Sequence, residues 1–452
     1  MAEQMKQETA GKTIPAGYKQ TEVGVIPEDW SVLAISDRHE IATGNTPPTA
    51  DACNYGADYL FIGPGDLGSG KYVFSSMKML SSKGFKLARK FPAGSTLFTC
   101  IGSTIGKTGY VVDVATSNQQ INAVFPNELD DSEFTYYALT NIAPKVKELA
   151  GEQAVPLVNK KDFGEMKYCL PANKQEQTAI ANVLSDSDAL IDALEQLIAK
   201  KQAIKSATMQ QLLTGRTRLP AFALRPDGTK KGYKPSELGE IPEDWEVKSV
   251  YALANNQKAL FDDGDWIEAE HITDKGVRLI QTGNIGIGSF IEKDVKKYVY
   301  EKSFESLRCK ELHIGDLLIC RLAEPAGRAC ILPYIGEAKV ITSVDVTIFR
   351  PERNIANRDF LVQYFSSTEW FKSVQEQVGG TTHKRISRGA LGQLLMPYPS
   401  LDEQTAIATI LSDMDNELQA LTQKLEKAHA LKQGMMQQLL TGKIRLPLTA
   451  GA

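Results

Sequence analysis

Apolar residues recur at alternating three- and four-residue spacings along two long stretches of the chain, residues 177–220 and 404–447. Such spacing places side chains on one face of an α-helix and is typical of a coiled-coil seam. Gly215 and Gly442 follow the last periodic residues, where a helix C-terminus favours glycine. We therefore predict two long helices that pack along a seam formed by Leu184, Ile191, Leu194, Ile198 and Leu212 in the first helix and by Leu411, Met414, Leu418, Leu421, Leu425, Met435 and Leu439 in the second.

Polar residues interrupt this seam at Lys201, Lys205 and Lys432. In a coiled coil, a polar residue at a seam position can set the register of the helices at some cost in stability. We therefore expect register-setting contacts at these lysines. The alternative is an ordinary amphipathic helix that packs only on its own domain.

Short apolar runs separated by glycine and proline fill the stretch before the first helix, and they are rich in β-branched and aromatic residues. This pattern predicts strands at 59–62, 95–100, 108–114 and 121–125, followed by a helix over 134–150. The stretch before the second helix repeats this order weakly, in residues 276–288, 313–332, 345–349 and 360–378. The expected fold class is α/β (α+β), with two mixed α/β domains joined by two long helices.

The chain is an internal duplication. Residues 404–447 match 177–220 at 25 of 44 positions, and residues 232–245 match 17–30 at 10 of 14. A repeat of this length decides the whole architecture. The shorter repeat predicts a lead-in loop in each half, anchored to a core by Trp30 or Trp245. The predicted divisions are a flexible tail (1–16), a first domain (17–170), a first helix (171–220), a linker (221–231), a second domain (232–398), a second helix (399–447) and a C-terminal tail (448–452).

The composition of the chain limits the classes of function that it can have. The formal net charge of −4 argues against a coat-like nucleic-acid binder, although it leaves room for a local basic face. The six cysteines are scattered without metal-ligand spacing, so we expect reduced thiols in a cytoplasmic protein. The polar N-terminus lacks the apolar segment of a secretory signal, and no apolar run is long enough to predict a membrane span.

Two segments carry positive charge without any acidic residue. Residues 67–112 hold seven lysines and arginines, among them Lys71, and residues 377–401 form a shorter segment of the same kind. Such a face can neutralise DNA phosphates and supply sequence-independent affinity. A solvated lysine-rich surface is the alternative. The candidate phosphate contacts are Lys83, Lys86, Arg89, Lys90, Lys107, Lys160, Lys161, His383, Lys384, Arg385 and Arg388.

Amide, hydroxyl and guanidinium side chains near these segments have the chemistry needed to read base edges. Asparagine and glutamine pair with adenine in the major groove, and arginine pairs with guanine. Each such residue, taken alone, can equally serve as a hydrogen-bonding group within a loop. The candidates are Asn118, Gln119, Gln120, Asn122, Asn284, Arg321, Arg328 and Thr382.

Motifs for catalysis are incomplete. Residues 63–68 fit the glycine pattern of a dinucleotide-binding turn, but the helix that must follow is missing from the predicted pattern. Residues 102–108 resemble a phosphate-binding loop that is one residue short. The sequence therefore predicts a binding protein with no catalytic, cofactor-binding or metal-binding residues of its own.

Taken together, these features resemble the specificity subunits of type I DNA restriction–modification systems. The resemblance rests on the paired Ile-Pro-Glu-Asp-Trp segments at 26–30 and 241–245, and on the paired Glu-Gln-Thr-Ala-Ile-Ala starts of the helices at 176–181 and 403–408. Two dissimilar blocks lie between these repeats, as is typical of the family. The resemblance covers residues 17–447, although the lead-in to the first helix is one residue longer than that to the second.

The resemblance implies that each block is a target recognition domain, which reads one half of a bipartite site in double-stranded DNA. The helices would pack antiparallel in a pseudo-twofold repeat, set the spacing between the half-sites and dock two methyltransferase subunits. The complex would methylate adenine N6 and, with restriction (motor) subunits added, would cleave DNA. S-adenosylmethionine, ATP and magnesium would bind the partners and not this chain. The alternative is a dual-domain protein-interaction scaffold that does not read DNA sequence.

Overall fold

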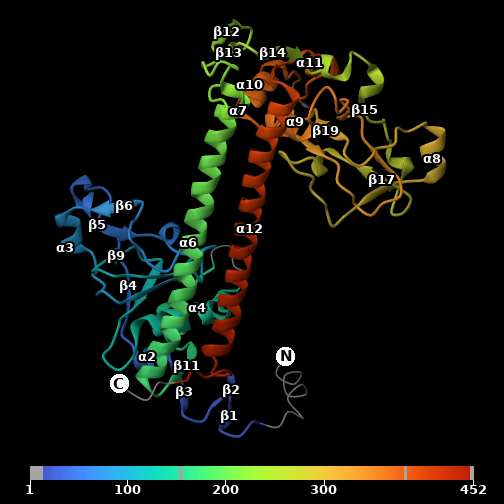
Figure 1. Ribbon diagram of the computed structural model, residues 1–452. Helices are drawn as coiled ribbons and strands as arrows, with labels where there is room; N and C mark the ends of the chain where they lie inside the picture. Colours follow the sequence, from blue (N-terminus) through green and yellow to red (C-terminus); the bar gives the residue numbers. More distant parts are fainter. Residues whose placement is uncertain (1–13, 152–155, 381–383, 448–452) are drawn as a thin grey trace. The chain divides into compact units, whose positions relative to one another are not determined.

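The computed structural model describes residues 14–151, 156–380 and 384–447. The chain divides into two compact units, the first formed by Met1–Leu197 with Leu421–Ala452 and the second by Ile198–Ala420. Each unit contains one mixed α/β domain and a part of each of the two long helices (Figure 1). The predicted fold class is therefore confirmed, although the compact units divide both helices.

The domain of the first unit is built on a four-stranded antiparallel sheet. Its strand order is β4-β10-β7-β8, with bounds Ile41–Thr43, Ile121–Val124, Thr96–Thr99 and Thr108–Tyr110. A second sheet has the order β6-β5-β9, with bounds Lys78–Leu80, Tyr55–Ile62 and Thr116–Ser117. Helix α4 (Ser132–Leu149) packs on the larger sheet and buries Phe134, Tyr137 and Leu139. The remaining elements are β1 (Tyr18–Thr21), β2 (Gly24–Pro27), β3 (Trp30–Ala34), α2 (Ile35–Arg38), α3 (Ser82–Leu87), α5 (Lys160–Gly164) and β11 (Lys167–Pro171).

The second unit repeats this order of strands. Its antiparallel sheet β15-β22-β19-β20 has bounds Phe261–Asp263, Val346–Phe349, Leu317–Cys320 and Ala329–Ile331. Its other sheet β16-β18-β17-β21 has bounds Ile272–Thr273, Lys297–Val299, Val277–Ile280 and Val340–Thr342. The remaining elements are α7 (Pro220–Ala223), β12 (Tyr233–Ser236), β13 (Gly239–Pro242), β14 (Glu246–Ser249), α8 (Glu301–Ser306), α9 (Arg358–Tyr364), α10 (Thr368–Gln377), α11 (Arg388–Gln393) and β23 (Leu395–Tyr398).

The two long helices, α6 (Lys174–Leu213) and α12 (Leu401–Leu439), pair within each unit. In the first unit Asp188 contacts Lys432 and Glu195 contacts His429, so residue numbers rise along one helix as they fall along the other. This direction makes the pairing antiparallel. The predicted seam residues are buried or half-buried, whereas most residues between them are exposed. No helix in the described ranges combines the length and the apolar content that a membrane crossing needs.

The end of each long helix closes the domain that precedes the other helix. Arg445 follows α12 and donates from Nε and Nη2 to the buried Glu176, at 2.8 and 2.6 Å, and from Nη1 to Asp29 at 2.9 Å. Trp30 Nε1 also donates to Glu176, at 3.3 Å. We call Asp29, Trp30, Glu176 and Arg445 the first clasp.

The second clasp consists of Asp244, Trp245, Glu403 and Arg218. Arg218 follows α6, donates from Nε to Glu403 at 2.6 Å and from Nη1 to Asp244 at 2.8 Å, and Trp245 Nε1 donates to Glu403 at 2.9 Å. Both tryptophans are buried, as expected. Burial raises the pKa of the Asp244 carboxyl, but hydrogen bonds from Arg218 and Lys231 outweigh this effect and lower its pKa to about 2.

Two local predictions were wrong. The segments before Trp30 and Trp245 form the hairpins β1–β2 and β12–β13, where the sequence predicted loops. Residues 360–378 form two helices, α9 and α10, because the Ser367 side chain accepts a hydrogen bond from Trp370 N and starts a new helix there. Gly215 and Gly442 have φ of +72° and +68°, which confirms the predicted glycine ends of α6 and α12.

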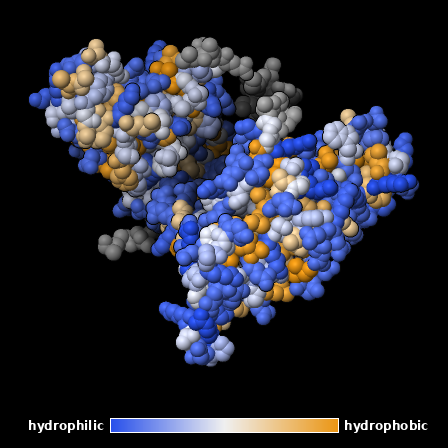
Figure 2. All heavy atoms as spheres, turned by 90° about the horizontal axis from the view of Figure 1, so that it is seen from above, coloured by the Kyte–Doolittle hydropathy of each residue, from blue (hydrophilic) through white to orange (hydrophobic). Residues whose placement is uncertain are grey.

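The face drawn in Figure 2 is mainly hydrophilic, with hydrophobic residues in scattered patches.

Candidate nucleic-acid interface

Polar side chains of the first domain meet at one edge of the four-stranded sheet, where β4 ends and β10 begins. Gly44 lies so close to Ser117 and Asn118 that a Cβ would collide with their carbonyl oxygens. Two residues later, Thr46 Oγ1 donates to Gln119 Oε1 at 2.6 Å. Asn118 Nδ2 donates to Gln120 Oε1 at 3.0 Å. Three of the predicted base-reading residues are therefore neighbours on one edge, and they are partly or fully exposed.

The basic segment joins this edge through Asn45. Its side chain accepts a hydrogen bond from Arg89 N at 2.6 Å and donates to Leu87 O at 3.1 Å. Arg89 lies just beyond α3, and it donates from Nη1 to Thr43 O at 2.7 Å. The predicted phosphate contacts Lys83, Lys86, Arg89, Lys90 and Lys107 are exposed, and Lys83 forms an ion pair with Asp51 at 2.6 Å. The basic side chains and the amide side chains that the sequence predicted as DNA contacts thus lie side by side in the first domain.

Lys71 belongs to the same acid-free segment but is not part of a basic surface. Its side chain is 2% exposed, and Nζ contacts Glu133 at 2.8 Å and Ser185 at 2.7 Å. The ammonium also lies 4.7 Å from the centre of the Tyr137 ring and 4.8 Å from that of Tyr72. Burial lowers the pKa of Lys71 from its ordinary value. This lysine joins the loop before β6 to helices α4 and α6.

The second domain has the corresponding edge with different side chains. Gly264 lies against the carbonyl oxygens of Thr342 and Ser343, as Gly44 lies against Ser117 and Asn118. Asp265 accepts a hydrogen bond from Lys310 N at 2.7 Å, which matches the bond between Asn45 and Arg89. The next residue, Trp266, is exposed. The geometry of the edge is therefore kept while its chemistry changes.

Basic residues of the segment 377–401 lie next to this second edge. Arg385 contacts Asp345 at 3.5 Å and forms backbone bridges with Leu322 and Gly379. Arg388 forms an ion pair with Asp262 of β15. Lys384 and Arg385 are exposed, whereas Arg388 is half-buried. The candidates Thr382 and His383 lie outside the described residues.

Several predicted base readers are used inside the fold instead. Asn122 is 3% exposed, accepts from Thr43 Oγ1 at 2.7 Å and donates to Cys100 Sγ at 3.2 Å. Asn284 is also 3% exposed and donates to Ile291 O at 2.9 Å. Arg321 is 5% exposed and donates to Val344 O. Asn122, Asn284 and Arg321 are therefore buried and hydrogen-bonded inside the fold. They are structural residues, which corrects their prediction as DNA contacts.

Arg328 is also used inside the fold, whereas Lys160 and Lys161 are exposed. Arg328 donates to four backbone carbonyl oxygens, among them Ile285 O at 2.7 Å, so it too holds loops together. Lys160 and Lys161 are exposed at the start of α5, and Lys161 lies 3.8 Å from Glu165. Their contact with DNA stays a prediction.

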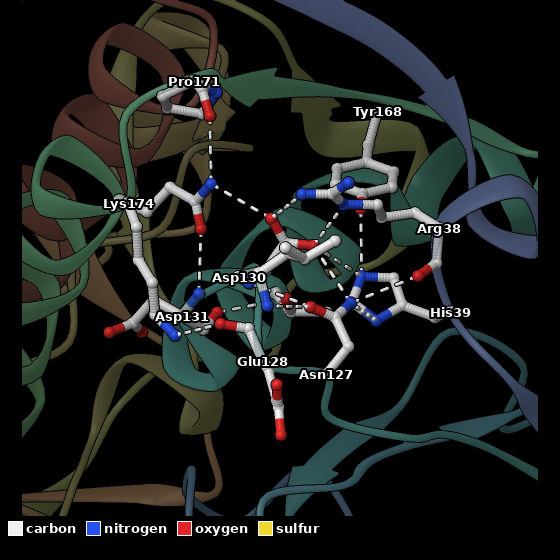
Figure 3. Close-up of polar contacts among 12 residues, drawn as sticks. Arg38, His39, Asn127, Glu128, Asp130, Asp131, Tyr168, Pro171 and Lys174 are labelled. Atoms are coloured by element: carbon white, nitrogen blue, oxygen red, sulfur yellow. Dashed lines mark hydrogen bonds and ion pairs between the residues drawn. The ribbon is translucent and has the colours of Figure 1, made fainter.

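Sequence reasoning missed a polar cluster under the first domain, which Figure 3 shows around Asp130. Arg38 Nε donates to Asp130 at 2.6 Å, and His39 Nε2 lies 3.0 Å from the Tyr168 hydroxyl. Gln177 at the start of α6 donates to Asp130 at 3.2 Å. Burial raises the pKa of Asp130, but hydrogen bonds led by Arg38 outweigh it and lower this pKa, while burial lowers the pKa of His39.

The lysines that interrupt the seam form the predicted contacts between the helices. Lys205 forms an ion pair with Asp415, and Lys432 forms one with Asp188. The internal repeat matches Lys205 with Lys432 and Asp188 with Asp415, so these are two copies of one contact. Lys201 contacts Glu417 at 2.7 Å. The retention of the same residues in both copies is the signal that could have identified the ion pairs and the clasps from sequence.

Comparison with known proteins agrees with this organisation. The family model of the type I restriction modification DNA specificity domain matches residues 27–205 and 242–429. The MjaVIII specificity subunit of Methanocaldococcus jannaschii is 26% identical over 428 residues, which cover 93% of this chain and 94% of the relative. The EcoDI specificity subunit of Escherichia coli is 20% identical over 94% of this chain and 90% of its own.

A solved structure has the same fold. The type I restriction–modification S subunit from M. genitalium superposes with a TM-score of 0.56 at 15% identity, over 97% of this chain and 99% of its own. The family model covers most of the chain in two copies, one for each domain with its helix. The chain therefore belongs to the family of type I restriction–modification DNA specificity subunits.

Proposed function

We propose that this chain selects the DNA sequence on which a type I restriction–modification complex acts. Each domain reads one half of a bipartite site through the sheet edge described above. The observation that carries this proposal is the pair of equivalent edges, which share their backbone contacts around Gly44 and Gly264 but differ in their side chains. Two sheet edges with the same backbone geometry and different side chains are suited to recognising two different half-sites.

The paired helices α6 and α12 set the spacing of the half-sites and dock two methyltransferase subunits, through which restriction subunits join. S-adenosylmethionine, ATP and magnesium bind these partners. The complex methylates adenine N6 and cleaves unmethylated DNA. Sequencing the methylated bases in a host that expresses the complete system tests this assignment, because it must reveal one two-part motif. Methylation without any dependence on two separated half-sites would instead favour a protein-interaction scaffold.

The electrostatic part of the proposal has a separate test. Lys86 and Lys90 are exposed beside the first edge. Replacing both with alanine should weaken binding to all duplexes about equally and flatten the salt dependence by up to roughly 2 units of slope. Arg89 stays in place because its guanidinium also holds Thr43 O.

The matched control replaces Lys145 and Lys147, which are exposed near the end of α4. It should leave the slope of affinity against salt unchanged, as measured by fluorescence anisotropy with labelled duplex. Loss of binding to one sequence only, after the Lys86 and Lys90 changes, would contradict a phosphate-contact role.

A further inference from the structure

One tryptophan differs from the other three in its surroundings. Trp30, Trp245 and Trp370 are 0%, 1% and 0% exposed, whereas Trp266 is 68% exposed. All four lie in the described ranges and account for every tryptophan of the chain. We propose that Trp266 contacts a nucleobase in the half-site of the second domain and helps determine its specificity. This inference rests on the proposed function.

The backbone that carries Trp266 is held firmly. Gly264, two residues earlier, is pressed against the carbonyl oxygens of Thr342 and Ser343, and Asp265 N donates to Thr342 O at 2.9 Å. The Asp265 side chain accepts from Lys310 N at 2.7 Å. The indole is therefore presented to solvent from a fixed loop, so that ordering it on a ligand costs little conformational entropy.

The equivalent position of the first domain supports a reading role. Thr46 stands two residues after Gly44, as Trp266 does after Gly264, and its hydroxyl donates to Gln119. The first edge thus presents a hydroxyl and an amide where the second edge presents an indole. A polar pair can hydrogen-bond to a base edge, whereas an apolar ring can contact the methyl group of thymine, so the two edges are suited to different bases.

The charges around Trp266 direct it to bases and away from phosphates. Asp262 and Asp265 are paired with Arg388 and Lys310, but the exposed Glu268 accepts from Trp266 Nε1 at 3.4 Å. The neighbouring Glu270 is also exposed. Carboxylates repel the DNA backbone, whereas they accept hydrogen bonds from the amino group of cytosine. An indole beside a carboxylate therefore fits the edge or face of a base.

The test uses the complete complex, with 5-hydroxytryptophan incorporated into this chain so that its emission can be excited apart from that of partner tryptophans. Because the other three indoles are buried, acrylamide quenching reports Trp266. A duplex with the recognised site should lower the quenching constant several-fold, and a duplex without the site should lower it less. Labelled-duplex anisotropy is measured in the same samples.

The two measurements separate the two proposals. Sequence-specific binding with unchanged acrylamide quenching would overturn the role of Trp266 and leave the proposed function intact. Absence of sequence-specific binding would overturn the proposed function itself.

Substitutions give a second readout. Trp266→Ala should weaken binding to the cognate duplex about tenfold and leave non-cognate affinity unchanged, since a mismatched base pair in a specific site costs on the order of 1–3 kcal/mol. Trp266→Phe keeps an aromatic ring and should stay within about threefold of the parent, because phenylalanine can make the same apolar contact with a base. Gln119→Ala is the matched control and should alter discrimination in the other half-site only. Equal losses of Trp266→Ala on cognate and non-cognate duplexes would overturn the inference.

Discussion

Arg445 and Arg218 occupy equivalent places in the two units, and each joins a buried glutamate to an aspartate that follows the adjoining hairpin. The sheet edges of the same two units share almost no side chains. Thr46 and Gln120 in the first unit correspond to Trp266 and Asp345 in the second. Contacts that hold the chain together were therefore retained after duplication, whereas the side chains of the two sheet edges diverged.

The residues beneath the two clasps also differ between the units. Beneath the first clasp, Arg38, His39 and Asp130 form the polar cluster of Figure 3. The equivalent residues of the second unit are Leu253, Ala254 and Ala356, and all three are buried in its core. One frame thus tolerates either a hydrogen-bonded or an apolar junction. The two units should therefore respond alike to changes in the clasps and differ where the residues beneath the clasps differ.

The largest expected effect is common to both units. Arg218→Met leaves the Glu403 carboxylate buried without its cation, which should cost about 3 kcal/mol of unfolding free energy. Arg445→Met should cost less, because 39% of the Arg445 side chain already meets water. Urea unfolding followed by hydrogen exchange in each unit measures both values.

The control for the clasp adds Glu403→Gln to Arg218→Met, which removes the uncompensated charge and should recover part of the loss. If Arg218→Met left the second unit as stable as before, the clasp would be only a surface contact.

A smaller common effect concerns the two equivalent ion pairs between the helices. Lys205→Met and Lys432→Met should each lower stability by about 1 kcal/mol, because each pair is only partly buried. Exchanging the charges, as Lys205→Asp with Asp415→Lys, should restore most of that stability. Thermal unfolding of the single and exchanged variants gives the coupling, and a coupling of zero in both pairs would exclude a role in setting register.

The smallest effect should break the similarity between the units. Burial lowers the pKa of His39, so the folded first unit holds a neutral imidazole while the unfolded chain binds a proton near pH 6.5. Stability should therefore be complete above that pH and decline as the pH falls below it. Hydrogen exchange at pH 7.5 and 5.5 should show this decline in the first unit only.

His39→Gln is the control for this pH effect, since an amide keeps hydrogen-bonding capacity without titrating. An identical decline in the variant would assign the pH dependence to another group.

Periodicity and repetition predicted most of the frame. Heptad spacing located the seam from Leu184 to Leu439 because buried positions on a helix recur at a fixed interval. Short apolar runs that contain β-branched residues predicted β7 and β10, because such residues are enriched in buried strands. The hairpin β1–β2 escaped prediction because its strands are short and mostly half-buried.

The candidate interface was only partly predictable. Composition identified Lys86 and Gln119, but it could not distinguish Lys71 from them, because a lysine is buried only when distant residues such as Glu133 and Tyr137 surround it. The predictions that Asn122 and Arg321 contact DNA failed for the same reason, since both side chains are buried. Trp266 was overlooked because an isolated aromatic residue looks like core until the fold shows that it is exposed.

The first clasp has a consequence for synthesis on the ribosome. The second unit is contiguous in sequence, and its clasp residues Arg218, Asp244 and Glu403 all precede residue 421. The first unit needs Arg445 to cover Glu176 and the end of α12 to cover α6. Domains generally fold as units as the chain emerges. The unit whose translation begins first is thus completed after the second unit, and the Glu176 carboxylate has no arginine partner until residue 445 has been translated.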